Sequence, residues 1–301
     1  MNQLRPNTIS GIIGQKDVIE VLNISIKSAK SRNDCLAHTL FYGPPGTGKT
    51  TLANAIANDM GCSIQIANGA NLRTIKTLLP YIMRVEKHCI LFIDEIHRMT
   101  NIVEEFLYPV MEDFKVDMST PNKDMGGETL SLDIPRFTLM GATTEYGSLS
   151  KPLIDRFQHK HTLKLYNKVE LLDIVNTNSK KLNLKMSHQA SNFVTKVSRG
   201  TPRIANAALE WLRDYQLAYS IETLTEANIE SAMAMKGIDP QGMTEMDRKY
   251  LKVLKNSGQP LGIETLSCMT GIDRQTIEGI IEPWLLQNSY IAKTSKGRVC
   301  I

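Results

Sequence analysis

Residues 43–50 read GPPGTGKT, which fits the pattern G-x-x-x-x-G-K-T. In a loop of this kind the backbone N–H groups wrap phosphate oxygens, the lysine (Lys49) reaches the outer phosphates, and the hydroxyl of the last threonine (Thr50) ligates Mg²⁺. The loop lies between a buried strand pattern, residues 38–42, and a helical pattern, residues 51–60. Because the motif requires that flanking context, we predict a phosphate-binding loop rather than an ordinary glycine turn.

Two adjacent carboxylates follow a second apolar run, residues 88–93. Asp94 could hold a metal ion, and Glu95 could activate a water for in-line attack on a phosphate. By itself this pair would be interpreted as a solvated acidic turn, but the phosphate loop favours the catalytic interpretation. Glu95 in particular indicates a hydrolase rather than a passive nucleotide binder.

Three further residues could complete such a site. Thr143 and Thr144 end a third apolar run, where a hydroxyl could orient the attacking water or contact the γ-phosphate. Arg156 could be a surface ion pair, or it could stabilise charge on a neighbouring subunit's nucleotide. Arg203 begins a helical pattern and could be solvated or could reach back to the phosphates.

Strands that alternate with helices and deliver polar residues at their carboxyl ends predict an open α/β sheet. Residues 115–133 are polar and contain glycine, with alternation at Leu130 and Leu132, and they predict a projecting hairpin. Residues 168–235 show helical periodicity with no strand pattern. Beyond a linker at 237–240, three helical segments and an alternating strand pair outline a winged helix. We therefore expect three domains: a large α/β domain (1–166), a small all-α domain (167–236) and a winged helix (237–301).

Composition narrows the classes of protein that fit. The net charge is +4, which permits a polyanionic partner without requiring one. No apolar run approaches the ~18 residues that span a bilayer, and the first residues do not resemble a secretory signal, so we expect a cytoplasmic protein. The five cysteines are scattered with no C-x-x-C pair, so we interpret them as small apolar fillers and predict no structural metal.

Several motifs together resemble the RuvB family, the bacterial Holliday-junction branch-migration motors of the AAA+ class. The resemblance covers residues 4–298 and rests on GPPGTGKTT, LFIDEIHR, LYPVMEDF, GATT, DRF, RGTPRIAN and a terminal EMDRKYL…TSKGR. MEDF and RGTPRIAN are not general AAA+ features. The resemblance implies an AAA+ P-loop NTPase with a lid and a winged helix, which uses ATP and Mg²⁺.

It also implies partners: a homohexamer acting on the duplex DNA of four-way junctions, RuvA docked on hairpin 115–133 through Leu130 and Leu132, and RuvC in the resolving complex. The residue roles that it implies fall into four groups. The nucleotide-binding residues would be Leu4, Arg5, Gly46, Gly48, Lys49, Thr50, Thr51, Glu112, Asp113, Phe114, Arg156, Tyr166 and Arg203. The catalytic residues would be Lys49, Asp94, Glu95, Thr144, Arg156 and Arg203. The metal ligands would be Thr50 and Asp94, and the DNA contacts Arg274, Lys293 and Arg298.

Two other functions remain open at this point. A DNA-binding initiator of AAA+ and winged-helix design would need a base-reading helix, and Ile277, Ile280 and Ile281 make a poor reading surface. A clamp-loader subunit would typically present serine-arginine-cysteine where this chain has Asp155-Arg156-Phe157.

The segment expected to bind DNA has little net positive charge. Residues 236–301 carry nine Lys or Arg against seven Asp or Glu, so their electrostatic attraction to the DNA backbone is expected to be weak.

Overall fold

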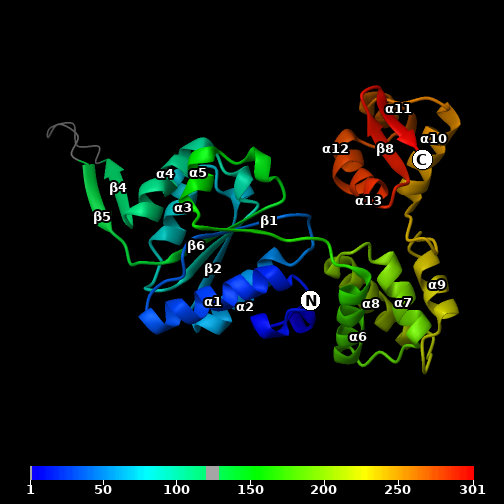
Figure 1. The fold of residues 1–301 in the computed structure, drawn as a ribbon, viewed down its shortest axis with the longest axis horizontal. Coiled ribbons are helices and arrows are strands. Elements are labelled where there is room, and N and C mark those ends of the chain that lie inside the picture. The colour runs from blue at the N-terminus through cyan, green and yellow to red at the C-terminus, as the bar shows by residue number, and fades with distance from the viewer. Residues whose placement is uncertain (1, 120–128) are drawn as a thin grey trace. The chain divides into compact units, whose positions relative to one another are not determined.

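The computed structural model describes residues 2–119 and 129–301 (Figure 1). The described residues form two compact units. The first comprises Met1–Glu170 with Thr201–Arg203, and the second comprises Leu171–Gly200 with Ile204–Ile301. Because this grouping is into two units, the expected division into three domains stays a prediction.

The first unit contains a parallel sheet that, among the described residues, has five strands in the order β2-β3-β6-β1-β7. The strands are β1 (Thr39–Tyr42), β2 (Ile64–Asn68), β3 (Ile90–Asp94), β6 (Thr138–Thr143) and β7 (His159–Thr162). The expected α/β fold is confirmed. The apolar runs predicted β1, β3 and β6, whereas β2 and β7 are additional edge strands.

Helices cover both faces of this sheet, with α1 and α2 on one face and α3, α4 and α5 on the other (Figure 1). Their bounds are α1 (Lys16–Arg32), α2 (Lys49–Met60), α3 (Ile75–Ile82), α4 (Asn101–Glu112) and α5 (Lys151–Arg156). In α1 the buried Val18, Leu22 and Ile26 recur every four residues and so form one stripe facing the sheet. Helix α2 ends where Gly61 adopts a left-handed conformation.

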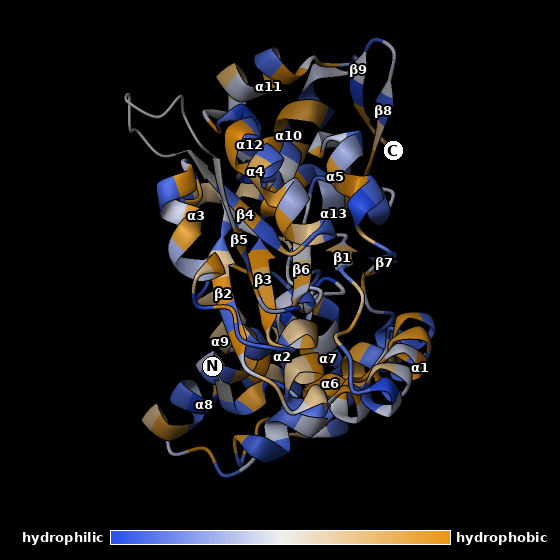
Figure 2. Ribbon diagram, turned by 90° about the vertical axis from the view of Figure 1, so that its left-hand side faces the viewer, coloured by the Kyte–Doolittle hydropathy of each residue, from blue (hydrophilic) through white to orange (hydrophobic). Residues whose placement is uncertain are grey.

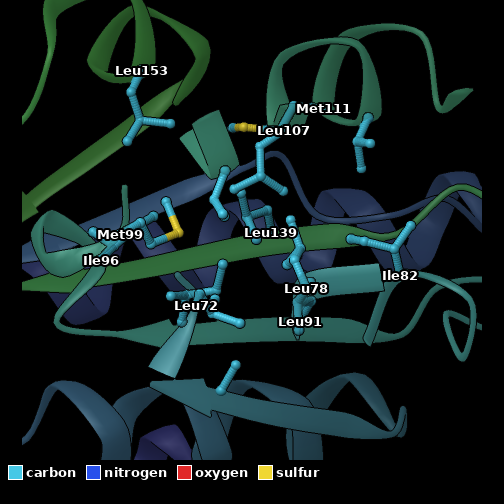
Figure 3. Close-up of a cluster of buried hydrophobic side chains, with 14 of the residues drawn as sticks. Leu72, Leu78, Ile82, Leu91, Ile96, Met99, Leu107, Met111, Leu139 and Leu153 are labelled. Atoms are coloured by element: carbon cyan, nitrogen blue, oxygen red, sulfur yellow. The ribbon is translucent and has the colours of Figure 1, made fainter. Parts of the chain in front are cut away.

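The inner strand β3 is hydrophobic along its length, as expected of a strand that helices cover on both sides (Figure 2). Alternate side chains of β3 enter the two cores. Leu91 packs with Leu78, Leu107 and Leu139 in the core under α3 and α4 (Figure 3), and Phe92 packs on the α1–α2 side. This double burial holds the carboxyl end of β3, where Asp94 lies, in a fixed position.

The expected hairpin is present as β4 (Lys115–Ser119) and β5 (Thr129–Asp133), which pair antiparallel with Val116 opposite Leu132. Residues 120–128 and the side chain of Leu130 lie outside the described part of the chain. The apolar contact expected of Leu130 therefore stays a prediction.

The second unit begins with helices and ends with a winged helix (Figure 1). The first helices are α6 (Lys168–Lys181), α7 (His188–Val197), α8 (Pro202–Ala218) and α9 (Glu226–Ala234). The winged helix comprises α10 (Glu245–Ser257), α11 (Ile263–Thr270), α12 (Arg274–Thr276), a π-helical turn (Ile277–Ile281), α13 (Glu282–Gln287) and the strands β8 (Ile291–Thr294) and β9 (Gly297–Cys300). Helix α10 is capped at its amino end by Thr244, which forms a capping box with Asp247.

One arginine connects the helical part of this unit to the winged helix. Arg199 follows α7 and donates from Nε and Nη2 to the carbonyl oxygen of Gly242, at 3.0 and 2.6 Å. It also forms an ion pair with the buried Asp247, and its guanidinium lies 4.3 Å above the ring of Trp284. A single side chain thus contacts the start of α10 and the middle of α13.

Within the described residues, no helix is both long enough and apolar enough to cross a membrane.

Candidate nucleotide-binding and catalytic site

The phosphate loop follows β1 and requires glycine at three positions. Gly43, Gly46 and Gly48 have φ values of 139°, 77° and 105°, in the region that favours glycine. A Cβ atom on Gly43 would overlap the carbonyl oxygen of Leu163, and one on Gly46 would meet Thr201. Glycine at these positions therefore lets the loop adopt its conformation and pack against Leu163 and Thr201.

Lys49 lies at the start of α2 with its ammonium group inside the loop. Nζ donates to the carbonyl oxygens of Gly43 and Pro44 at 2.8 and 3.0 Å. Burial lowers the pKa of Lys49; Glu95 and Asp94 act in the opposite direction, and Arg203 adds to the lowering. A buried ammonium that donates to neutral carbonyl oxygens suits an anionic ligand, because phosphate oxygens would pair its charge.

Thr50 and Asp94 form the second part of the site. The Thr50 hydroxyl donates to Asp94 Oδ2 at 3.3 Å. Asp94 is the last residue of β3, so the sheet brings it to the amino end of α2. A hydroxyl and a carboxylate are the oxygen ligands that Mg²⁺ prefers, and this pair therefore fits a divalent ion beside the loop.

Glu95 and Thr144 come together from adjacent strands, β3 and β6. The Thr144 hydroxyl donates to Glu95 Oε2 at 3.1 Å, and the Thr144 backbone N–H lies 3.4 Å from the same oxygen. Glu95 has a left-handed φ of 47°, which is uncommon for a residue other than glycine and is typical of functional sites. The arrangement holds a carboxylate where it can accept a proton from a water.

His97 is a residue of this site that the sequence analysis missed. Its Nδ1 lies 2.9 Å from Thr143 Oγ1 and 3.4 Å from Glu95 Oε2, and its Nε2 lies 3.8 Å from Glu145 Oε1. Thr143 Oγ1 also accepts from the Glu145 backbone N–H at 2.9 Å. The available signal was the position of His97 two residues after Glu95, on the short turn that follows β3.

Tyr166 and Arg203 also lie beside the phosphate loop. The Tyr166 hydroxyl donates to the Thr47 carbonyl oxygen at 3.3 Å, and burial raises the pKa of Tyr166 to about 12. A Cβ atom on Gly46 would lie 3.1 Å from the Cβ of Arg203.

Three other predicted nucleotide-binding residues differ in exposure. Thr51 is half-buried on the first turn of α2, Leu4 is buried and Arg5 is exposed.

The structure does not bring Arg156 and the MEDF segment to this chain's own phosphate loop. Arg156 donates to Glu112 Oε2 at 3.3 Å, and its guanidinium lies 3.9 Å above the ring of Tyr108. Phe114 packs edge-on against Phe137, which directly precedes β6. These side chains and the exposed Asp113 therefore lie at the amino edge of a parallel sheet whose carboxyl edge carries the loop.

The three expected DNA contacts are all in ion pairs. Arg274 Nε lies 2.9 Å from Glu278, and Lys293 Nζ lies 2.6 Å from Glu282. Arg298, 13% exposed, donates from Nε to the fully buried Glu282 at 2.8 Å. Arg274 and Lys293 are about half exposed, whereas Arg298 is largely enclosed by the winged-helix core.

Comparison with known proteins separates this chain from other P-loop proteins. Residues 4–163 match the description "Holliday junction DNA helicase RuvB P-loop domain". Residues 166–239 match the RuvB AAA lid domain, and residues 240–300 match the RuvB C-terminal winged helix domain. The chain belongs to the RuvB family.

Individual RuvB proteins are similar along the whole chain. The "Holliday junction branch migration complex subunit RuvB" of Rhodopirellula baltica is 41% identical over 298 residues, which cover 98% of this chain and 81% of the relative. That of Campylobacter hominis is 42% identical over 297 residues, covering 98% and 87%. The solved Thermotoga maritima RuvB "Holliday junction branch migration motor" is similar with a TM-score of 0.86 at 34% identity, covering 99% and 96%. Membership in this P-loop family implies nucleotide binding and a divalent metal.

Proposed function

We propose that this chain is the ATP-driven motor subunit that moves duplex DNA during Holliday-junction branch migration, in bacterial recombination and repair in the cytoplasm. The observation that carries the proposal is the convergence of Lys49, the Thr50–Asp94 pair and the Thr144–Glu95 pair at one edge of the sheet, in a chain of the RuvB family. ATP supplies the anionic phosphates, and Mg²⁺ is the divalent ion that the oxygen ligands select.

Each side chain has a distinct part in hydrolysis. Lys49 exchanges the carbonyl oxygens of Gly43 and Pro44 for phosphate oxygens, which pairs its buried charge. Thr50 and Asp94 would hold the metal, whose charge offsets that of the phosphates. Glu95 accepts a proton from the attacking water, and Thr144 fixes the orientation of the Glu95 carboxylate.

Arg156 is supplied to the nucleotide of a neighbouring subunit in a ring, and we take that ring to be a homohexamer. The position of Arg156 and Glu112 at the edge opposite the phosphate loop supports this part of the proposal. Glu112, Asp113 and Phe114 then face the neighbour's nucleotide, while Leu4, Arg5, Gly46, Gly48, Thr51, Tyr166 and Arg203 serve the chain's own.

The winged helix contacts the DNA backbone through Arg274, Lys293 and Arg298. Arg298 also holds the wing in place through its ion pair with Glu282. Hairpin β4–β5 is the proposed docking site for RuvA, and RuvC joins the resolving complex. Contacts to phosphates without base readout suit a translocating motor, because sequence preference would stall it.

The experiment is branch migration of a synthetic four-way junction with ATP and Mg²⁺, with and without RuvA. Strand separation that depends on RuvA and is abolished in Glu95→Gln is the expected result. Mixing Arg156→Ala with Lys49→Ala subunits tests action between subunits, since each supplies what the other lacks and partial ATPase activity returns. ATP-dependent DNA binding without strand movement would instead favour an initiator-type switch.

A further inference from the structure

We propose that Asp34, Cys35 and His88 form a Zn²⁺ site at the amino edge of the sheet. Asp34 and Cys35 lie in the loop between α1 and β1, and His88 lies in the turn before β3. One carboxylate oxygen, the thiol sulfur and one imidazole nitrogen all lie within 4.8 Å of one another. The site is separate from the phosphate loop, which follows the carboxyl end of β1.

Local backbone geometry presents the three side chains to one point. The Cys35 backbone N–H donates to Asp34 Oδ1 at 2.8 Å, which folds the carboxylate back beside the cysteine. His88 has a left-handed φ of 67°, and its N–H donates to the Arg136 carbonyl oxygen at 2.9 Å. The turn that carries the imidazole is therefore held in a conformation that a residue other than glycine rarely adopts.

The donor set selects the metal. Sulfur, nitrogen and oxygen donors together suit Zn²⁺, which takes Zn–S bonds of about 2.3 Å and Zn–N bonds of about 2.0–2.1 Å. A tetrahedral ion at those lengths draws its ligand atoms to about 3.5 Å apart, which small side-chain rotations achieve from the present positions. Mg²⁺ prefers oxygen ligands only, so the metal of the nucleotide site does not compete here.

The surroundings leave room for a fourth ligand. A cavity of about 370 Å³ opens beside the cluster and is lined in part by Asp34, His88, Cys62 and Glu86. Water can reach the ion through this opening, which completes a set of three protein ligands and one solvent ligand. Burial and the neighbouring Asp34 raise the pKa of the Cys35 thiol, so the metal must displace its proton on binding. Glu86 adds negative charge to the cavity, whereas Lys30 and Lys87 in the same lining add positive charge.

The present partner of Asp34 does not block the site. Arg136 Nη1 lies 3.7 Å from Asp34 Oδ1, and both side chains are substantially exposed. An exposed pair of this length contributes little free energy, so the metal readily displaces it. The second carboxylate oxygen, Oδ2, can also turn toward the thiol by rotation about χ2.

The test uses the full chain, stripped of metal with a chelator and titrated with Co²⁺ in excess Mg²⁺. Co²⁺ bound by a thiolate absorbs in the near ultraviolet, and Zn²⁺ should then bleach that band with one equivalent. We expect the band in the wild-type chain and its loss in Cys35→Ser. Zn²⁺ affinity should fall at least about tenfold in His88→Asn. Removing a residue that only orients a metal ligand already lowers the affinity by about this factor, and removing the ligand itself should lower it at least as much.

Two matched cysteine variants serve as controls. Cys268→Ser removes an exposed thiol on α11, and Cys62→Ser removes the thiol that lines the same cavity. Both should keep the band, and Asp34→Asn should weaken Zn²⁺ binding even if Cys35→Ser fails to fold. Absence of a thiolate band in the wild-type chain, or its persistence in Cys35→Ser, would overturn the site. Loss of the band in Cys62→Ser alone would overturn the assignment of ligands.

Discussion

Thr144 holds one oxygen of the Glu95 carboxylate with two donors, its hydroxyl at 3.1 Å and its backbone N–H at 3.4 Å. The backbone donor directly follows β6 and persists in every substitution at position 144 except proline. The hydroxyl can be removed alone. The pair therefore allows the orientation of the proposed base to be tested without removing the base.

Thr144→Val should lower the kcat of ATP hydrolysis about tenfold to a hundredfold, because a misdirected carboxylate no longer meets the attacking water. The Kd for nucleotide should change little, since Lys49 and Thr50 are untouched. Steady-state ATPase kinetics beside nucleotide titration separate the two effects. Thr144→Ser is the control and should retain most of the activity; equal loss in both variants would contradict the role of the hydroxyl.

His97→Ala should also lower kcat more than it raises KM, because His97 links Glu95 Oε2 to Thr143 Oγ1 and lies on the turn after β3 rather than in the phosphate loop. His97→Asn should restore part of the rate, since the amide can occupy the position of Nδ1. A change in KM alone, or no rescue by asparagine, would show that His97 serves only in packing.

Arg298→Ala should destabilise the chain by about 3 kcal/mol, because it removes the main partner of a fully buried carboxylate. Urea unfolding followed by circular dichroism measures this change. The exposed Arg274 provides the contrast: Arg274→Ala should leave the unfolding midpoint unchanged and weaken DNA binding. If Arg298→Ala were as stable as wild type and lost only DNA affinity, Arg298 would be a DNA contact rather than a structural cation.

The same buried carboxylate makes stability depend on pH. Burial raises the pKa of Glu282, but hydrogen bonds from Arg298 and Lys293 outweigh burial and hold the pKa below its ordinary value of 4.5. A carboxyl group whose pKa is lower in the folded state stabilises above the unfolded pKa and loses that contribution as pH falls. The unfolding free energy should therefore decline below about pH 4.5. A Glu282→Gln chain should show a smaller decline over the same interval, from a lower starting stability.

Lys293→Ala should weaken DNA binding by a similar factor on all sequences and reduce the slope of log K against log salt by about 1. The reason is that Lys293 is half exposed on the wing and would contact a phosphate. Fluorescence anisotropy with two unrelated duplexes over a salt series gives both quantities. Loss confined to one duplex would point to base readout.

The central strands and the phosphate-site residues could be predicted from the sequence because local signals coincide with them. Fully buried strands such as β3 are continuous apolar runs, and the loop between β1 and α2 has a fixed pattern of residues. The edge strands β2 and β7 lack this signal: β7 reads HKHT and has one buried side chain. Their pairing depends on neighbours that are distant in sequence, so periodicity could not reveal them.

Two features of the sites also needed three dimensions. The sequence predicts that MEDF lies at the end of a helix, but it does not predict at which edge of the sheet that helix ends. The separation of MEDF from the chain's own phosphate loop was therefore not predictable. Asp34 and Cys35 are more than 50 positions from His88, and the interpretation of the cysteines as fillers could not anticipate their meeting. Arg298 was assigned to DNA by family position, and that assignment stays a prediction. Its ion pair with the buried Glu282, which lies 16 residues earlier, could not be read from the sequence.

The contacts of Arg199 affect how the helical segment and the winged helix can move. The Arg199 guanidinium contacts Gly242, Asp247 and Trp284 at the same time. These contacts stiffen the connection between the helical segment and the winged helix. A rotation of α7 would therefore be passed on to the winged helix instead of being absorbed by a flexible linker. In the proposed motor, the stiffness of this joint would set how much of each rotation reaches the winged helix.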